Sequence, residues 1–122
     1  MTDQAIEQEI QDRGLTAPRI TPDMIEGEIE SENYFTAQHG VVGAALSANP
    51  SAAVCDGGRN PLNLLTICVL VMKNGFTVTG ESACASPENF DAELGKKIAR
   101  KNAVDKIWPL MGYELRSKLS GS

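Results

Sequence analysis

The residues of this chain that are best suited to ligand recognition lie in its last third. Asn102 carries an amide that can read the edge of a base or ribose. Lys97 and Arg100 can hold a phosphate, and Phe90 and Arg116 can stack on a base. Plainer roles stay open for all five: Phe90 in the core, Asn102 in a structural hydrogen bond, and the cations on a solvated face. Their shared chemistry predicts binding of a small anionic nucleotide.

Catalysis and metal binding find little support in the residue types. His39 is the single histidine and stands beside Gly40, which indicates a polar turn rather than the base of a nucleophile pair. The cysteines, Cys55, Cys68 and Cys84, form no CxxC pair and do not supply ligands at a spacing that suits a metal. We therefore expect a binding protein rather than an enzyme, without metal or cofactor.

Charge is unevenly distributed along the 122 residues, whose net charge is −5. Residues 1–38 hold nine acids against two bases, whereas residues 86–122 hold seven bases against five acids. This pattern favours a homo-oligomer or a small anionic ligand and disfavours duplex nucleic acid, which needs an extended basic surface.

The longest apolar run, Ile67–Met72, is too short to cross a membrane, and the polar start is unlike a signal peptide. We expect a reducing, cytosolic setting.

The strongest structural signal is Asn74-Gly75, which stands between two strand-like runs, residues 64–73 and 76–84. It predicts a β-hairpin with a two-residue type I′ turn, in which Val71 faces Val78. The first strand is apolar on both faces. We expect a helix to cover one face and a second subunit to cover the other.

The amino-terminal part is expected to form an arm and linker over residues 1–19, with a short helix over residues 3–13. Residues 20–122 are expected to form a single domain. Thr21-Pro22-Asp23 is a typical helix start, and this helix should end near Ser31.

The middle of the chain gives weaker signals. Residues 34–36 and Val41-Val42 are strand candidates. Residues 47–61 are rich in small residues, Gly and Pro, and predict a long loop. Within it, Asp56-Gly57-Gly58-Arg59 resembles a phosphate-binding loop only superficially, because the P-loop pattern is missing.

A long helix is predicted over residues 87–107, with Ser86 as its cap and Pro109 as its end. Residues 112–119 predict a further short helix. The fold class is therefore α+β: a small antiparallel β-sheet centred on a 64–84 hairpin, packed against a long carboxy-terminal helix, with amino-terminal helices. Two inward stripes are expected on the long helix, one apolar (Phe90, Leu94, Ile98) and one of small residues (Ala92, Gly95, Ala99, Ala103).

Several short motifs of the second half carry a family resemblance. They are KNGFTVTGESAC at residues 73–84, PENFD at 87–91, GKKIA at 95–99 and IWPL at 107–110, followed by Gly112-Tyr113. With these motifs the chain resembles the gene-product forty-nine/sixty-six family of small accessory proteins of tailed phages. The resemblance implies a phage origin and little about mechanism.

The chain also resembles the first class of Thoeris anti-defence proteins, in its two-sided sheet, basic carboxy-terminal helix and lack of a catalytic set. That resemblance implies an oligomeric nucleotide sponge that holds cyclic ADP-ribose isomers between protomers in the host cytoplasm. It assigns no ligand contact to a particular residue. The alternative is a protein–protein interaction module that inhibits a host factor without a small-molecule ligand.

Overall fold

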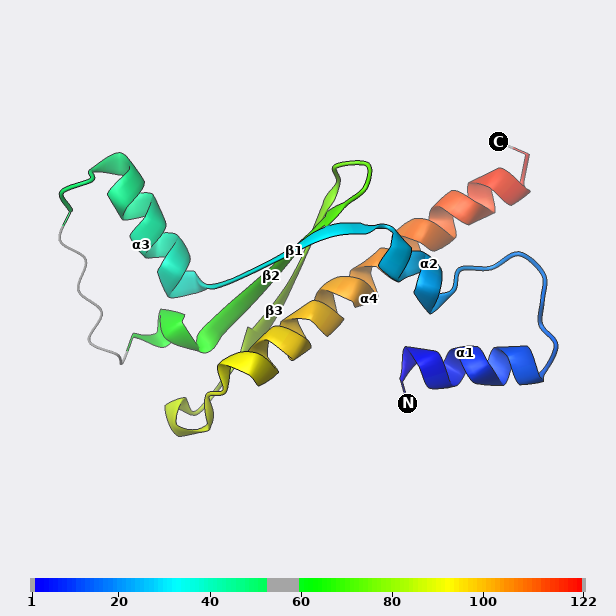
Figure 1. Ribbon diagram of the computed structural model, residues 1–122, viewed down its shortest axis with the longest axis horizontal. Coiled ribbons are helices and arrows are strands. Elements are labelled where there is room, and N and C mark those ends of the chain that lie inside the picture. Colours follow the sequence, from blue (N-terminus) through cyan, green and yellow to red (C-terminus); the bar gives the residue numbers. More distant parts are fainter. Residues whose placement is uncertain (1, 53–59, 122) are drawn as a thin grey trace.

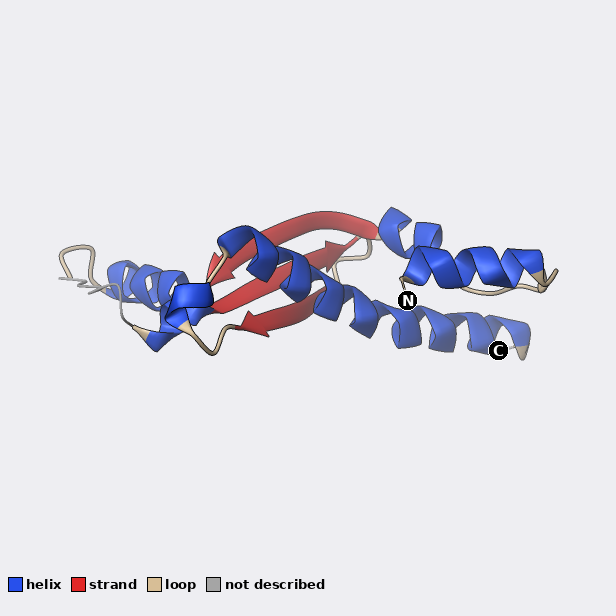
Figure 2. Ribbon diagram, turned by 90° about the horizontal axis from the view of Figure 1, so that it is seen from below, coloured by secondary structure: helices blue, strands red, loops and turns tan. Residues whose placement is uncertain are grey.

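The computed structural model describes residues 2–52 and 60–121, and it is elongated (Figure 1). A three-stranded antiparallel sheet in the order β1-β2-β3 forms its centre, and the long helix α4 crosses one face of that sheet (Figure 2). Helix α3 projects beyond one end of the sheet, and α1 lies beside the far half of α4 (Figure 1). The predicted α+β fold is confirmed. Cys55 and the Asp56-Gly57-Gly58-Arg59 segment lie outside the described residues.

The described chain contains helices and strands in both of its halves. The elements are α1 (Asp3–Asp12), α2 (Pro22–Gly27), β1 (Ile29–Thr36), α3 (Ala37–Ala48), β2 (Leu65–Met72), β3 (Thr77–Ala83) and α4 (Ala92–Leu119), with 3-10 turns at Pro61–Leu64 and Pro87–Asn89.

The hairpin is present, but its predicted turn and register are wrong. The Met72 nitrogen donates to the Phe76 oxygen at 2.8 Å, so three residues form the loop. Of the three loop residues, Gly75 alone has a positive φ, of 88°, which fits a type I turn followed by a glycine bulge rather than a type I′ turn. The register moves by one residue, and Val78 faces Leu70 instead of Val71. A shift of one residue exchanges the faces that the two strands share.

Two predictions for the first half of the chain are also wrong. Helix α2 starts as predicted, with the Thr21 hydroxyl accepting from the Met24 nitrogen, but it ends at Gly27 rather than near Ser31. The residues after it form β1, because they pair with β2 along its whole length. Val41-Val42 lies inside α3, whose start is closed by a reciprocal capping box between Thr36 and His39. The strand candidate at residues 34–36 is confirmed within β1.

The long helix differs from its prediction at both ends. Asp91, not Ser86, caps α4, since its carboxylate accepts from the Leu94 nitrogen at 3.0 Å. Pro109 lies inside the helix, which continues to Leu119. A proline removes one backbone hydrogen bond from a helix. Met111, which follows Pro109, packs against the core and helps to stabilise the continued helix. The predicted helix over residues 112–119 is thus the last part of α4.

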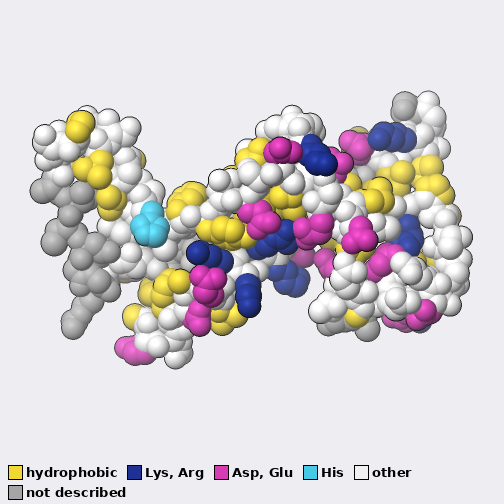
Figure 3. Space-filling model, in the orientation of Figure 1, with side chains coloured by type: hydrophobic (Ala, Val, Ile, Leu, Met, Phe, Trp, Pro, Cys, Tyr) yellow, Lys and Arg dark blue, Asp and Glu magenta, His cyan; other side chains and the backbone are white. Residues whose placement is uncertain are grey.

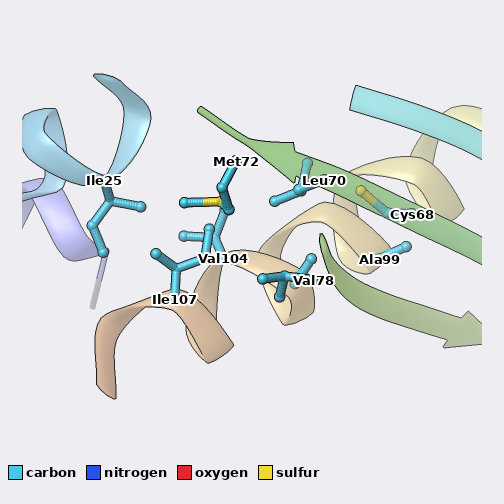
Figure 4. Close-up of a cluster of buried hydrophobic side chains, with 9 residues drawn as sticks. Ile25, Cys68, Leu70, Met72, Val78, Ala99, Val104 and Ile107 are labelled. Carbon is cyan, nitrogen blue, oxygen red and sulfur yellow. The ribbon is translucent and has the colours of Figure 1, made fainter. Parts of the chain in front are cut away.

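Small residues decide how α4 meets the sheet. A Cβ on Gly80 would lie 2.1 Å from the Ala99 oxygen and 2.3 Å from the Ala103 nitrogen, so the helix backbone rests directly on β3. The stripe of small residues therefore faces the sheet as predicted, whereas Leu94 and Ile98 of the apolar stripe are 54% and 43% exposed. Around this contact the core gathers side chains from α2, both hairpin strands and α4 (Figure 4): Ile25, Cys68, Leu70, Met72, Val78, Ala99, Ala103, Val104 and Ile107.

The opposite face of the sheet is open within the described chain. Alternate residues of β2 that point away from α4 are only half-buried, and their neighbours on β3, Thr77 and Thr79, are exposed. The expectation that a helix covers one face is confirmed, and Leu70 and Met72 lie under that helix. The half-buried residues of the open face in β2 are Leu65, Ile67, Val69 and Val71.

Candidate functional site

A groove runs between the start of α1, the short helix α2 and one side of α4. Its volume is about 460 Å³. Two of the predicted ligand residues, Lys97 and Arg100, lie on its wall, together with Lys101. We call it the arm groove; its remaining lining residues are Thr2, Asp3, Gln4, Pro22, Ile25, Glu26, Val104 and Trp108.

One side of α4 forms a wall of the groove, because four of its lining residues recur at helical spacing. Lys97, Lys101, Val104 and Trp108 follow one another at intervals of three and four residues and therefore share a side of the helix. The basic residues come first and the apolar ones follow. The groove thus has a cationic end and an apolar end.

Arg100 is held by two carboxylates. Its Nη1 and Nη2 donate to the two carboxylate oxygens of Glu26 at 3.0 and 2.6 Å, and its Nε donates to Glu32 at 3.0 Å. Hydrogen bonds from Arg100, and then from Tyr34, lower the pKa of Glu32, while the two carboxylates raise the pKa of Arg100. The fork of the guanidinium thereby ties α4 to α2 and β1.

The two lysines of the groove make fewer ion pairs than Arg100 in the described chain. Lys101 reaches Asp105 on its own helix at 3.1 Å, an exposed pair that contributes little to stability. Lys97 makes no ion pair with any residue that the structure describes. Figure 3 shows Lys and Arg side chains interleaved with Asp and Glu over the middle of the molecule. Lys97 and Lys101 are therefore the cations most able to meet an anion here.

The amino-terminal arm closes one side of the groove through few contacts. The Trp108 indole nitrogen donates to the Asp3 carboxylate at 3.2 Å. Farther along the arm, Glu7 pairs with Arg19 and also accepts from Gln11 at 2.7 Å. Hydrogen bonds from Arg19 and then from Gln11 lower the pKa of Glu7 to about 2. The arm is thus folded back on its own linker, and Trp108 joins it to α4 through a hydrogen bond.

The other three predicted ligand residues lie outside this groove. The Asn102 amide donates to the Glu81 oxygen at 2.8 Å, which is the structural role left open above. Phe90 is half-buried and lines a separate hollow of about 270 Å³ beside Cys84. Arg116 is exposed near the other end of α4, about 36 Å from Ala92 at 1.5 Å per residue. A single chain therefore cannot bring Phe90 and Arg116 to one small ligand.

Sequence reasoning missed Trp108, Asp3 and Glu26 as groove residues. The spacing of Trp108 from Lys97 and Lys101 was a usable signal, because it places all three on one side of a continuous helix. That signal was hidden by the assumption that Pro109 ends the helix. Asp3 and Glu26 gave no comparable signal, since only the tertiary structure brings the arm and α2 to α4.

A protein-family model identifies the family of the chain. The family model for phage proteins related to N4 Gp49 and to gene 66 of phage Sf6 matches residues 20–119. The chain belongs to this phage protein family. No curated protein and no solved structure matches it.

Two further properties of the family member concern metals and membranes. Within residues 2–52 and 60–121, no cluster of three or more His, Cys, Asp or Glu side chains could hold a metal ion. In the same part of the chain, no helix combines the length and the hydropathy needed to cross a membrane.

Proposed function

We propose that this phage accessory protein binds and sequesters a small anionic nucleotide, with a cyclic ADP-ribose isomer as the representative ligand. By removing an immune signal in the host cytoplasm it would counter host defence, as a binding protein and not as an enzyme. The observation that carries the proposal is the arm groove, where Lys97 and Lys101 stand beside Trp108 and an apolar wall. The resemblance to nucleotide sponges supports the same ligand class.

The dimensions and chemistry of the groove suit such a ligand. A volume of about 460 Å³ is within the range of small-molecule sites. A pyrophosphate would lie against Lys97 and Lys101, and a base would lie along Val104 and the Trp108 ring. Arg100 stays paired with the carboxylates of Glu26 and Glu32 and thereby holds α4 beside α2. Its role is to position the lysines rather than to bind phosphate.

The test compares binding of cyclic ADP-ribose and of a cyclic dinucleotide by thermal shift and calorimetry. A ligand that binds only the folded protein raises Tm, so we expect a clear rise with at least one of the two. Lys97→Ala/Lys101→Ala should abolish it, whereas Lys73→Ala/Lys106→Ala, with the same loss of charge outside the groove, should keep it. No rise with wild-type protein at saturating nucleotide would overturn the proposal.

Two additional measurements locate the site and distinguish capture of the nucleotide from its turnover. Loss of binding in Phe90→Ala/Arg116→Ala, with the lysine variant unaffected, would move the site from the groove to the ends of α4. Mass spectrometry should recover the nucleotide unchanged after incubation with the protein. A converted nucleotide would contradict simple sequestration.

A second candidate function is favoured by the open face of the sheet. This face and α3 carry few charges: α3 has no acidic or basic residue other than His39, and Val41 is 51% exposed. Such a surface suits a protein–protein interaction module that inhibits a host factor. A single stoichiometric host protein recovered with wild-type protein but not with Val41→Asp, and without a bound nucleotide, would favour this function.

A further inference from the structure

The polar contacts of the arm, residues 2–19, lie mostly within the arm itself. Both ion pairs of its described residues join two residues of the arm. None of its described side chains belongs to the hydrophobic core, which along the chain begins at Ile25. The hydrogen bond from Trp108 to Asp3 ties the arm to α4. A segment with so few buried contacts opens at a low free-energy cost.

The arm also lies outside the segment that the family model matches. That match covers residues 20–119, so it begins where the arm ends. The sheet, α2 and α4 all lie within the matched segment. The role of the arm is therefore a property of this chain that the family match does not cover.

Docking of the arm places a negative charge inside a groove that is cationic at one end. Helix α1 has four acidic residues and no basic one, and its first residue is Asp3. Lys101 precedes Trp108 by seven residues, which is about 10 Å along α4. This distance is comparable to the Debye length of about 10 Å at 0.1 M salt, so the Asp3 carboxylate beside Trp108 repels an anion held by Lys101. The charged residues that line the groove are Asp3, Glu26, Lys97, Arg100 and Lys101.

The docked arm also uses the polar atom of the Trp108 ring. The indole nitrogen is the only donor of this side chain, and it donates to the Asp3 carboxylate at 3.2 Å. A nucleotide that extends from the two lysines to Trp108 would therefore meet a carboxylate at the end where its base should lie. The arm and such a nucleotide compete for the same end of the groove.

We propose that the arm is an autoinhibitory gate of the arm groove and that Asp3 is the residue that closes it. In the free protein the docked carboxylate keeps anions away from Trp108. A nucleotide binds when the arm opens, and the bound nucleotide then keeps the arm open. The gate acts on any anion, whereas its role in the capture of an immune signal rests on the proposed function.

Such a gate lowers the apparent affinity of the groove in proportion to the time for which it is closed. If the arm is open for roughly one tenth of the time, a ligand binds about tenfold more weakly than it binds to the open form. The coupling is reciprocal, so the nucleotide must weaken docking of the arm by the same factor.

The first measurement needs no nucleotide and uses the fluorescence of Trp108, the single tryptophan. Iodide is an anionic quencher, and acrylamide is a neutral one. Asp3→Asn keeps an acceptor for the indole but removes the charge, so iodide quenching should rise about twofold or more at constant ionic strength, while acrylamide quenching stays near the wild-type value. Asp12→Asn, the same change at the exposed far end of α1, should alter neither. Equal iodide quenching in wild type and Asp3→Asn would overturn the proposal.

The second measurement follows the arm while cyclic ADP-ribose binds. A helix of ten residues is marginal alone in water, so the amides of α1 should exchange faster with solvent once the nucleotide releases the arm. Asp3→Ala removes both the charge and the acceptor and should bind cyclic ADP-ribose about threefold to tenfold more tightly than wild type, as measured by calorimetry. Slower exchange in α1 on binding, or equal affinity of the two proteins, would overturn the gate and leave the proposed function standing.

The two measurements also distinguish failure of the gate from failure of the proposed function. Absence of nucleotide binding by both wild type and Asp3→Ala would overturn the proposed function. A rise in iodide quenching in Asp3→Asn would still support the gate in that case, because iodide reports access of an anion to Trp108 directly.

Discussion

At Gly80, the absence of a side chain decides how closely α4 approaches the sheet. The nearest atoms to a Cβ there belong to the backbone of α4 and cannot rotate away. Gly80→Ala should therefore lower the free energy of unfolding by about 3 kcal/mol or more. The measurement is urea denaturation, with Gly43→Ala as the control, because nothing lies within 4 Å of a Cβ at Gly43. In an open helical position alanine should raise stability by about 0.5–1 kcal/mol.

Arg100 is the residue whose removal should reveal the electrostatic link between α4, α2 and β1. Arg100→Met leaves Glu26 and Glu32 without their counter-charge, and we expect a loss of about 1–2 kcal/mol at neutral pH. The control is Lys97→Met, which removes a cation that has no partner in the described chain and should change stability little.

Acidification should reduce the effect of Arg100→Met. The pKa of Glu32 is lowered in the folded state, so its contribution is present above the unfolded pKa of about 4.5 and is lost as the pH falls below it. The difference between wild type and variant, followed by urea denaturation at a series of pH values, should therefore stay constant above about pH 4.5 and shrink as the pH falls below it. An unchanged difference at low pH would mean that packing, not charge, accounts for the effect.

At the scale of elements, the arm is tied to α4 by the hydrogen bond between Trp108 and Asp3. Trp108 is the single tryptophan, so its fluorescence reports whether α1 is docked against α4. Glu7→Gln removes the ionised partner of Arg19 and should shift Trp108 emission to longer wavelength at neutral pH, because the arm loosens and water reaches the indole. Glu9→Gln, which affects only an exposed pair within α1, should leave the spectrum unchanged.

The same signal should follow pH in the wild-type protein. Glu7 has a folded pKa of about 2, below its usual value of 4.5. Its contribution to arm docking is complete above about pH 4.5 and is lost as the pH falls towards 2. A Trp108 transition confined to pH values above 5 would exclude Glu7 as its cause.

At the scale of the whole molecule, the chain is extended rather than compact (Figure 1). A compact domain of 122 residues has a radius of gyration of about 14 Å. We expect small-angle scattering of the protein as a single chain to give a clearly larger value, because α3 and the far half of α4 project from the sheet (Figure 1). A value near 14 Å would show that α3 or the arm folds back over the open face.

The sequence by itself determined the elements that depend on local chemistry: the capped start of α2 at Thr21, the existence of the hairpin around Asn74-Gly75, the stripe of small residues on α4 and the phage family. It also predicted a small anionic ligand from the residue types of Lys97 and Arg100, and this stays a prediction. These features follow from side-chain type and from spacing along one element, which a sequence states directly.

Only the tertiary structure decided the features that depend on distant partners. Pairing with β2 made residues 29–36 a strand, and a three-residue loop moved the hairpin register by one position. Continuation of α4 through Pro109 placed Trp108 beside the lysines, and Glu26 and Glu32 converted Arg100 from a free cation into a link between three elements. Each of these outcomes is set by contacts between segments far apart in the chain, whose energies exceed the local preferences that a sequence pattern records.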